Sequence, residues 1–528
     1  MADVRNLALV PRWVRTALLL VAWAASAGAV AQTATPSFED GACPFVLPAE
    51  VQNEVRCGRL TVPIDRSDAS AGTLELQVAI LASTASEPAE PIVYLEGGPG
   101  GSAVATVPFW WTTSRLREHG EVIVFDQRGT GYSTPSLDCW EWYLDRAPDP
   151  EAACRVRLER EALPLEAFGS DDSAQDVLDL LTALEIDAAS LVGSSYGTRL
   201  ALWILRTDPS AIRSVVLDGV YPPHVRHLER QGPLGWSALK AVLLACGADA
   251  GCAETYPRID RALVAAMVRR NADPMRDVGG GWLDGQGLYV ALVDLLYDTD
   301  GIPYVPALVE AAYRGDVARW ASLWARYEAG FGTTEDYLAE IEALTAWLTG
   351  RAVGPELDAF LDGLSSAEYA SLRARAEGLY DLDTEAMYYA VECAEEVPFT
   401  RTDVAARRIA QLPAPLDFLI DDVTWMQRAC ASWGVPAMPA SERTPVQSDV
   451  PTLLLSGAFD PITPPVLAQE AATHLSRSHV VVVPGMGHGT IDVRPCPTEI
   501  TLSFLADPSR APDTSCLAEG DPPAFILR

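Results

Sequence analysis

The sequence predicts an α/β fold in which a mostly parallel sheet is interrupted by a large helical insertion. Two observations carry this prediction. Before about residue 221, and again after about residue 448, short apolar runs that end in glycine or a turn alternate with helical patterns. Such alternation is typical of a parallel sheet with crossover helices. Between these blocks, Ala, Leu, Arg and Glu recur at helical spacing without short strands.

The strands and helices of the two blocks follow from their apolar patterns. In residues 32–221 the amphipathic run Asp172–Leu184 predicts a helix with acidic residues in its first turn. In residues 448–528 helices are predicted at Pro465–Leu475 and Thr498–Leu505. The predicted strands are Leu60–Ile64, Thr73–Ser83, Pro91–Leu95, Val122–Phe125, Ala189–Val192, Ser214–Leu217, Pro451–Leu455 and His479–Val483. The insertion, residues 222–447, has helical patterns at Val305–Trp324, Asp336–Leu348 and Ala367–Gly378.

The composition is that of a large, acidic, globular protein. The chain has 528 residues, 49% of them hydrophobic, and 72 acidic against 39 basic residues give a formal net charge of −33. This apolar content excludes a mainly disordered chain. An acidic surface repels phosphate groups, so we expect no nucleic-acid partner and no attachment to anionic membranes through basic patches.

Residues 1–31 are predicted to be a signal peptide. Three arginines precede an apolar stretch at residues 17–30, which is short for a membrane span. A cleavage site of the A-x-A type ends at Ala31, and an uncleaved anchor is the alternative. We therefore expect an exported protein, periplasmic or extracellular, without membrane attachment after cleavage.

Ten cysteines follow this segment, and an even number in an exported chain indicates disulfides. Sequence alone leaves their connectivity open. Neither C-x-x-C nor histidines at ligand spacing occur, so we expect no metal site. The spacing favours five bridges between consecutive cysteines, 43–57, 139–154, 246–252, 393–430 and 496–516.

A nucleophilic serine is predicted at Ser195. The segment Gly193–Gly197 has the pattern G-x-S-x-G, in which a serine is held on a tight turn between a strand and a helix. An apolar run ends at Val192 and a helical pattern starts at Thr198, and this context makes the short motif specific. The alternative is an ordinary turn built from small residues.

A serine nucleophile needs a histidine base, and in folds with this motif the acid lies between the two in the chain. His488 follows the last predicted strand in a glycine-flanked loop, so we predict that it is the base. Asp460 follows the preceding strand and is the predicted acid. Asp218, at the end of an earlier strand, is the rival, and a helix N-cap is the structural alternative for Asp460.

Acyl transfer also requires donors aimed at the developing oxyanion. We predict the N–H of Tyr196, directly after the nucleophile, and that of Gly98, in the loop Glu96–Ser102. A glycine-rich loop can instead bind phosphate, but no G-K-[ST] follows this one.

Together these motifs resemble those of the proline iminopeptidase and tripeptidyl aminopeptidase family of α/β-hydrolases. The motifs are Gly97–Gly100, Asp126–Ser133 and Gly193–Gly197, and the segments around Asp460 and His488 resemble the C-terminal region of the tripeptidyl branch. The resemblance implies an α/β-hydrolase core, a helical cap inserted after strand 6, and cleavage from free N-termini. The sequence departs from proline iminopeptidases at Glu96, where those enzymes carry histidine.

An aminopeptidase must recognise a charged amine, for which carboxylates in the cap are natural partners. Glu392, Glu395 and Glu396 lie close together beside Cys393. The resemblance favours Glu395, with Glu396 as its neighbour, and Glu96 beside the oxyanion loop is a further candidate. A solvated acidic turn is the alternative for all three positions near the cysteine.

The sequence thus predicts a secreted serine exopeptidase that acts on short peptides with free N-termini and needs no cofactor. A secreted carboxylesterase or small-molecule amide hydrolase is the alternative on the same fold, because the cap and the pocket decide the substrate. A binding protein without catalysis is disfavoured by the complete set of triad residues. Neither the number of residues removed per cleavage nor the oligomeric state follows from the sequence.

Overall fold

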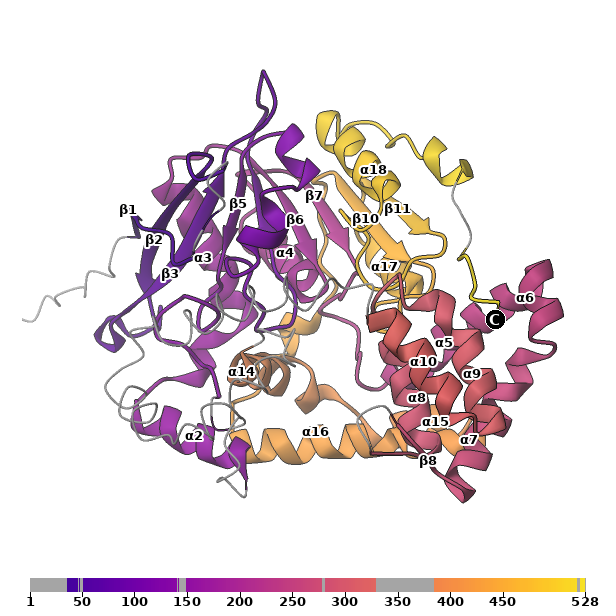
Figure 1. Ribbon diagram of the computed structural model, residues 1–528. Coiled ribbons are helices and arrows are strands. Elements are labelled where there is room, and N and C mark those ends of the chain that lie inside the picture. Colours follow the sequence, from indigo (N-terminus) through magenta and orange to yellow (C-terminus); the bar gives the residue numbers. More distant parts are fainter. Residues whose placement is uncertain are drawn as a thin grey trace, which may run out of the picture.

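The computed structural model describes residues 36–45, 47, 51–139, 141, 149–277, 281–328, 384–519 and 523–527. The predicted signal peptide and the predicted helices Asp336–Leu348 and Ala367–Gly378 lie outside these residues. In the described part, a nine-stranded sheet carries helices on both faces, and a second group of helices lies beside it (Figure 1).

The sheet is mostly parallel, as predicted, with an antiparallel edge. Its strand order is β1-β2-β3-β5-β4-β6-β7-β10-β11. The pairs from β1 to β5 along this order are antiparallel, and every pair from β5 to β11 is parallel. The strands are β1 (Ser37–Gly41), β2 (Val55–Pro63), β3 (Thr73–Leu81), β4 (Ile92–Leu95), β5 (Val122–Phe125), β6 (Ala189–Ser194), β7 (Ile212–Asp218), β10 (Thr452–Gly457) and β11 (Ser478–Val483).

Helices cover both faces of the parallel part, which is why its strands are unbroken apolar runs. Leu200 of α4 belongs to the core on one face, and Phe504 of α18 belongs to the core on the other. The edge strand β1 was not predicted because its side chains are largely exposed and show no apolar alternation. The helices of this part are α2 (Pro150–Arg160), α3 (Ser170–Ala183), α4 (Tyr196–Thr207), α17 (Pro465–Ala472) and α18 (Pro495–Ala506).

The described residues between β7 and β10 form a helical cap, most of which packs around a hydrophobic core of its own, while residues 386–393 join the core of the sheet. The run predicted as one helix, Val305–Trp324, is two helices, because Gly315 (φ 72°) ends the first in the left-handed conformation. The cap also contains a hairpin of two-residue strands, β8 (Met275–Arg276) and β9 (Trp282–Leu283). Its helices are α5 (Gln231–Ala248), α6 (Ala250–Thr255), α7 (Ile259–Ala272), α8 (Gly285–Asp294), α9 (Val305–Arg314), α10 (Val317–Glu328), α14 (Glu385–Glu395), α15 (Thr402–Ile409) and α16 (Leu419–Trp433).

The cap contacts the loops that follow the strands of the sheet. The N–H of Thr384 donates to Gly100 O at 3.0 Å, which joins the cap to the loop after β4. A Cβ on Gly487, in the loop after β11, would lie 2.0 Å from Leu296 O of the cap. The C-terminal segment runs from the sheet to the cap and ends beside α5 and α6 (Figure 1), where Phe525 joins the cap core.

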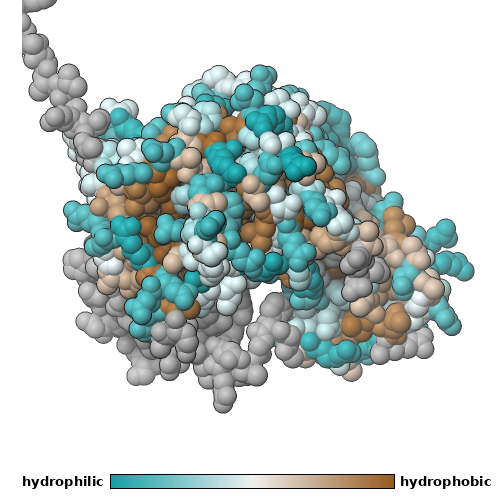
Figure 2. Space-filling model, turned by 90° about the horizontal axis from the view of Figure 1, so that it is seen from above, coloured by the Kyte–Doolittle hydropathy of each residue, from teal (hydrophilic) through white to brown (hydrophobic). Residues whose placement is uncertain are grey.

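Five disulfides connect consecutive cysteines, in the pairing that their spacing favours. They indicate an oxidising compartment. Among the described residues, no helix is long and apolar enough to cross a membrane. On the face shown in Figure 2, hydrophobic side chains lie in separate groups between hydrophilic ones.

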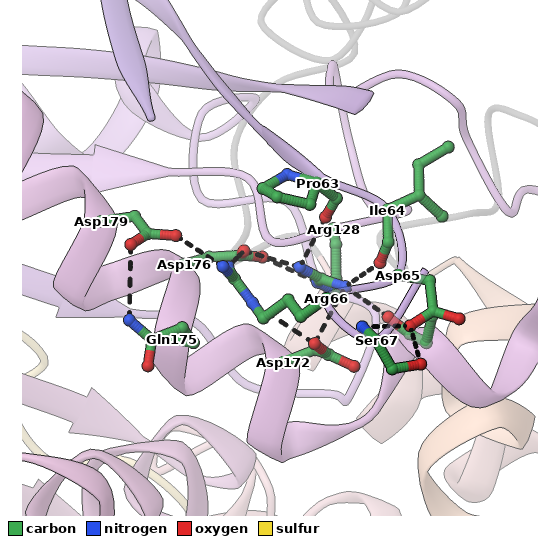
Figure 3. A network of polar contacts seen from close by, with 11 residues as sticks. Pro63, Ile64, Asp65, Arg66, Ser67, Arg128, Asp172, Gln175, Asp176 and Asp179 are labelled. Carbon is green, nitrogen blue, oxygen red and sulfur yellow. Dashed lines mark hydrogen bonds and ion pairs between the residues drawn. The ribbon is translucent and has the colours of Figure 1, made fainter. Parts of the chain in front are cut away.

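A buried ion network fixes the Asp126–Ser133 loop to the sheet (Figure 3). Arg128 is fully buried and binds both carboxylate oxygens of Asp176 on α3, at 2.6 and 2.7 Å. Its Nη1 also donates to Ile64 O at 2.9 Å, and Arg66 binds Asp179 at 2.7 Å. The arginine of this motif therefore has a structural role, because every one of these partners lies in the scaffold.

Replacing Arg128 by Met should destabilise the fold by about 3 kcal/mol, because the buried Asp176 carboxylate loses the guanidinium that binds both of its oxygens. Urea unfolding of both single variants and of Arg128→Met/Asp176→Leu measures this. The double variant should regain part of the loss. Additive losses would contradict a direct interaction.

Candidate active site

Ser195 sits on a strained turn between β6 and α4. Its backbone has φ 51° and ψ −119°, which a non-glycine residue adopts only under constraint. A Cβ on Gly193 would lie 2.5 Å from Gly197 O, and one on Gly197 would lie 1.9 Å from Leu95 O. The two glycines of the motif are thus required by close backbone approach, and the turn holds Ser195 at the carboxyl end of the central strand.

His488 and Asp460 are joined by a hydrogen bond. His488 Nδ1 lies 2.9 Å from Asp460 Oδ2, and Asp460 is completely buried. The other carboxylate oxygen accepts the N–H groups of Ile462 and Thr463, both at 2.8 Å. Thr463 Oγ1 donates to Asp460 Oδ2 at 2.7 Å and lies 3.1 Å from His488 Nδ1. Because Asp460 only accepts, the proton of a neutral His488 is held on Nδ1, and Nε2 is left to take a proton.

The electrostatics of this pair favour a charged imidazolium. Burial alone would lower the pKa of His488, but the charge and hydrogen bond of Asp460, with a smaller effect of Asp218, raise it above its ordinary value. Burial would likewise raise the pKa of Asp460, yet the charge of His488 and the hydrogen bonds of His488 and Thr463 lower it overall. The site therefore stabilises the charge that His488 acquires when it accepts a proton.

Asp218, the rival acid, binds the backbone beyond His488 and makes no hydrogen bond to the ring. Its Oδ2 accepts the N–H groups of Thr490 and Ile491 at 2.6 and 2.9 Å, and its Oδ1 accepts Thr490 Oγ1 at 3.0 Å. Its main-chain oxygen accepts the N–H of Ser195 at 2.9 Å. One residue thus anchors both the nucleophile turn and the loop of the base.

Replacing Asp218 by Asn should lower kcat about tenfold with little change in KM, because one carboxylate oxygen becomes a donor that faces Thr490. The loss of a negative charge should also shift the acidic limb of the pH profile to lower pH, since Asp218 raises the pKa of His488. Steady-state kinetics across pH test this. A proportional loss at every pH would indicate a purely structural role.

The loop after β4 lies against Ser195. A Cβ on Gly97 would lie 3.1 Å from Ser195 Cβ, and the next residue, Gly98, is exposed with φ 104°. Asp126 fixes this loop by accepting Ser102 Oγ and the N–H of Val104, both at 2.9 Å. The loop is therefore held against Ser195, where the predicted donor Gly98 has to lie.

Tyr196, a predicted oxyanion donor, begins α4, and Glu96, a candidate for the substrate amine, directly follows β4. Tyr196 is the first residue of α4, so its N–H has no partner within the helix. Its side chain is buried and its hydroxyl pairs with Ser170 Oγ at 2.9 Å. Glu96 Oε1 accepts the N–H of Gly97 at 2.7 Å and the hydroxyl of Tyr94 at 3.4 Å, and burial raises its pKa.

Glu395 and Glu396, the two cap glutamates predicted to bind the substrate amine, form ion pairs with arginines. Glu395 accepts Arg199 Nε at 2.9 Å and the N–H of Ser170 at 2.8 Å. Glu396 accepts Arg443 Nη1 at 3.0 Å and the N–H of Leu228 at 3.1 Å. All four charged side chains are buried, so these carboxylates are already neutralised inside the protein and are poorly suited to bind a substrate amine.

Glu392, one turn earlier on α14, is different. Its Oε1 accepts the hydroxyl of Tyr221 at 3.2 Å, and among the described residues no arginine lies within ion-pair distance of it. Burial raises the pKa of Glu392 to about 7, although the charge of Arg199 opposes this. Glu395 and Glu396 each have an arginine partner, whereas Glu392 has none within ion-pair distance among the described residues.

A short series of contacts connects Glu392 to the triad. The N–H of its partner Tyr221 donates to Thr198 Oγ1 at 2.8 Å, and Thr198 Oγ1 donates to Ser195 O at 2.6 Å. Gly219 lies against the base, since a Cβ there would be 3.1 Å from His488 Cε1. These contacts fix the main chain of Tyr221, the partner of Glu392, to the turn that carries the nucleophile.

Tyr297 of the cap completes the surroundings of the base. Its ring meets that of His488 edge-on, with centroids 5.2 Å apart. Sequence reasoning missed Tyr297 because no local motif distinguishes it from other aromatic residues of the insertion. Glu392 was noticed but not selected, and only the positions of Arg199 and Arg443 separate it from its neighbours.

Two family models match the chain. A model described as alpha/beta hydrolase fold matches residues 90–241, which include Ser195, and one described as TAP-like protein matches residues 417–516, which include Asp460 and His488. The chain is an α/β-hydrolase. With the serine protease and iminopeptidase relatives described below, these matches make it a serine hydrolase.

This α/β-hydrolase is similar to several known proteins. It is 24% identical to serine protease Hip1 of Mycobacterium tuberculosis over 474 residues, 82% of each chain. It is 28% identical to YuaR of Escherichia coli K12 over 183 residues, 32% of this chain, and so spans only 36% of that relative. It is 27% identical to a proline iminopeptidase of Heyndrickxia coagulans over 128 residues, 24% of this chain and 34% of the relative.

Proposed function

We propose that this hydrolase is an exported serine exopeptidase that releases residues or short peptides from the free N-termini of peptides. The observation that carries the proposal is the hydrogen-bonded pair of His488 and Asp460, accompanied in the cap by a buried glutamate, Glu392, that has no arginine partner among the described residues. A substrate ammonium would supply the missing positive charge. The serine protease and iminopeptidase relatives support peptidase chemistry, and the five disulfides support export.

In the proposed mechanism Ser195 Oγ attacks the carbonyl carbon of the scissile bond while His488 Nε2 takes its proton. The N–H groups of Gly98 and Tyr196 stabilise the oxyanion of the tetrahedral intermediate. When the intermediate collapses, His488 gives the proton to the leaving nitrogen and the acyl group stays on Ser195. Water then attacks the ester, His488 accepts its proton and returns it to Ser195, and the acyl product leaves.

The amine site in this proposal is Glu392, held by Tyr221, in place of Glu395 and Glu396. A peptide ammonium bound there lies on the cap side of Ser195, which limits the length of the acyl part. Glu96 is a weaker candidate, because its carboxylate is directed at the N–H of Gly97 and the hydroxyl of Tyr94.

The test is a matched substrate panel with the purified protein. It contains Pro-, Ala- and Ala-Ala-Pro-anilides, each free and N-acetylated, and a short-chain p-nitrophenyl ester, with Ser195→Ala as the blank. We expect turnover of a free-amine anilide that is lost on acetylation. Turnover of the ester alone, or equal turnover of acetylated peptides, would assign the chain to the esterases or general amidases.

A further inference from the structure

A pocket lies beside His488, apart from the glutamate cluster. Its walls come from β4, the short helix η2 (Val107–Trp111), the nucleophile turn and the loop that follows the base. The side chains that matter here are Tyr94, Trp110, Trp111, Ser194, Ile491 and Asp492. His488 itself lines the pocket, so whatever occupies it is adjacent to the group that moves the proton.

One wall of the pocket is aromatic, and most of that wall is fixed by packing. Trp111 is buried, with its ring centroid 4.2 Å from that of Tyr94 and its Nε1 donating to Thr106 Oγ1 at 3.1 Å. Trp110 is 45% exposed and is the wall that a ligand would cover. Rigid aromatic surfaces favour a flat or bulky apolar group, which gains the most from leaving water.

Apart from His488, the charged groups of the pocket are carboxylates. Asp492 accepts Ser114 Oγ and Thr498 Oγ1, and Asp218 accepts three donors of the loop after His488. No described basic side chain other than His488 lines this pocket. An acidic ligand group would therefore meet unfavourable charge there.

The position of the pocket relative to His488 and to the amine cluster decides which part of a peptide substrate it can hold. The pocket shares no lining residue with the amine cluster of Glu392, Tyr221 and Arg199. A peptide whose ammonium binds Glu392 places its acyl part at the cap. The departing residue must instead lie beside His488, because His488 protonates its nitrogen.

We propose that this pocket receives the side chain of the residue that follows the cleaved bond, and that it selects large apolar or aromatic side chains over acidic ones. The inference rests on the proposed exopeptidase function. It assigns Trp110 as a specificity-determining residue for the leaving part of the substrate.

The experiment uses free-amine peptides that share the acyl part selected by the anilide panel and continue with Phe, Leu, Gly or Asp. Product release is followed by chromatography for the wild type, Trp110→Ala, Trp110→Phe and Trp282→Ala. Trp282 is 64% exposed in the cap hairpin and lines neither site, so it is the matched control. We expect kcat/KM for Phe to exceed that for Gly by about tenfold or more, with Asp lowest.

In Trp110→Ala the preference for Phe over Gly should fall about tenfold, Trp110→Phe should restore most of it, and Trp282→Ala should leave it unchanged. Equal rates for all four peptides in the wild type would overturn the proposal, as would an equal loss for all of them in Trp110→Ala. The anilide panel, in which the leaving group is constant, is repeated with Trp110→Ala, and a changed preference among its acyl parts would assign the pocket to the other side of the bond. Each of these results is distinct from failure of the exopeptidase proposal, which shows as cleavage that does not depend on the free amine.

Discussion

Replacing Asp460 by Asn is expected to lower kcat by about 10⁴-fold on every substrate that the protein cleaves. The reason is the donor pattern around the carboxylate. Its Oδ1 accepts the N–H groups of Ile462 and Thr463, so the amide oxygen of Asn must take that position. The amide NH₂ then faces His488 Nδ1, where Oδ2 accepted a hydrogen bond before. His488 must therefore carry its proton on Nε2, and it can no longer accept one from Ser195.

Steady-state and pre-steady-state kinetics on an ester and on a free-amine anilide measure this loss. Because Asn has the same shape as Asp, thermal unfolding should show a folded protein. Thr463→Val is the matched control, since it removes one hydrogen bond to Asp460 Oδ2 and leaves the acceptor for His488 in place. Its effect should stay within about tenfold. Activity of Asp460→Asn close to that of the wild type would return the acid role to Asp218.

The nucleophile turn could be predicted because its causes are local. The strand, the close approach of Gly193 to Gly197 and the following helix lie within about twenty residues, and each leaves its mark on the sequence. The disulfide pairs were predictable for the same reason, since consecutive cysteines close short loops. Asp460 and His488 required one further step, the order of nucleophile, acid and base along the chain in folds with this motif.

The choice among the glutamates could not be predicted, because it depends on contacts between distant segments. Glu395 and its partner Arg199 are 196 residues apart, and Arg199 lies on the helix that carries the nucleophile. Nothing in the sequence around Cys393 tells which of three neighbouring carboxylates an arginine will neutralise. The helical register of α14 and the packing of the cap on α4 decide it, and both are tertiary properties.

Replacing Glu392 by Gln is expected to lower kcat/KM for free-amine peptides by about 10²- to 10³-fold and to leave ester hydrolysis nearly unchanged. The loss follows because the substrate ammonium, largely buried when it is bound, would no longer have the Glu392 carboxylate as its partner. Glu395→Gln is the matched control, because it should act on the fold and spare the choice of substrate. It leaves Arg199 buried without its partner and should cost about 3 kcal/mol of stability in urea unfolding.

The pH dependence separates the amine site from the base. Burial raises the pKa of Glu392 to about 7, so its charged fraction, and with it kcat/KM for free-amine peptides, should rise as the pH passes through that value. Above about pH 8 the peptide amine loses its proton and the rate should fall. An ester without an amine should show only the rise that belongs to His488, and Glu392→Gln should give peptides that simpler profile. Glu392→Gln should also not lose stability at pH 8. The pKa of Glu392 is raised in the folded protein, so its ionised form destabilises the fold at that pH, and Gln removes this charge. An unchanged peptide profile in Glu392→Gln would exclude Glu392 from amine recognition, whatever happens to the rate.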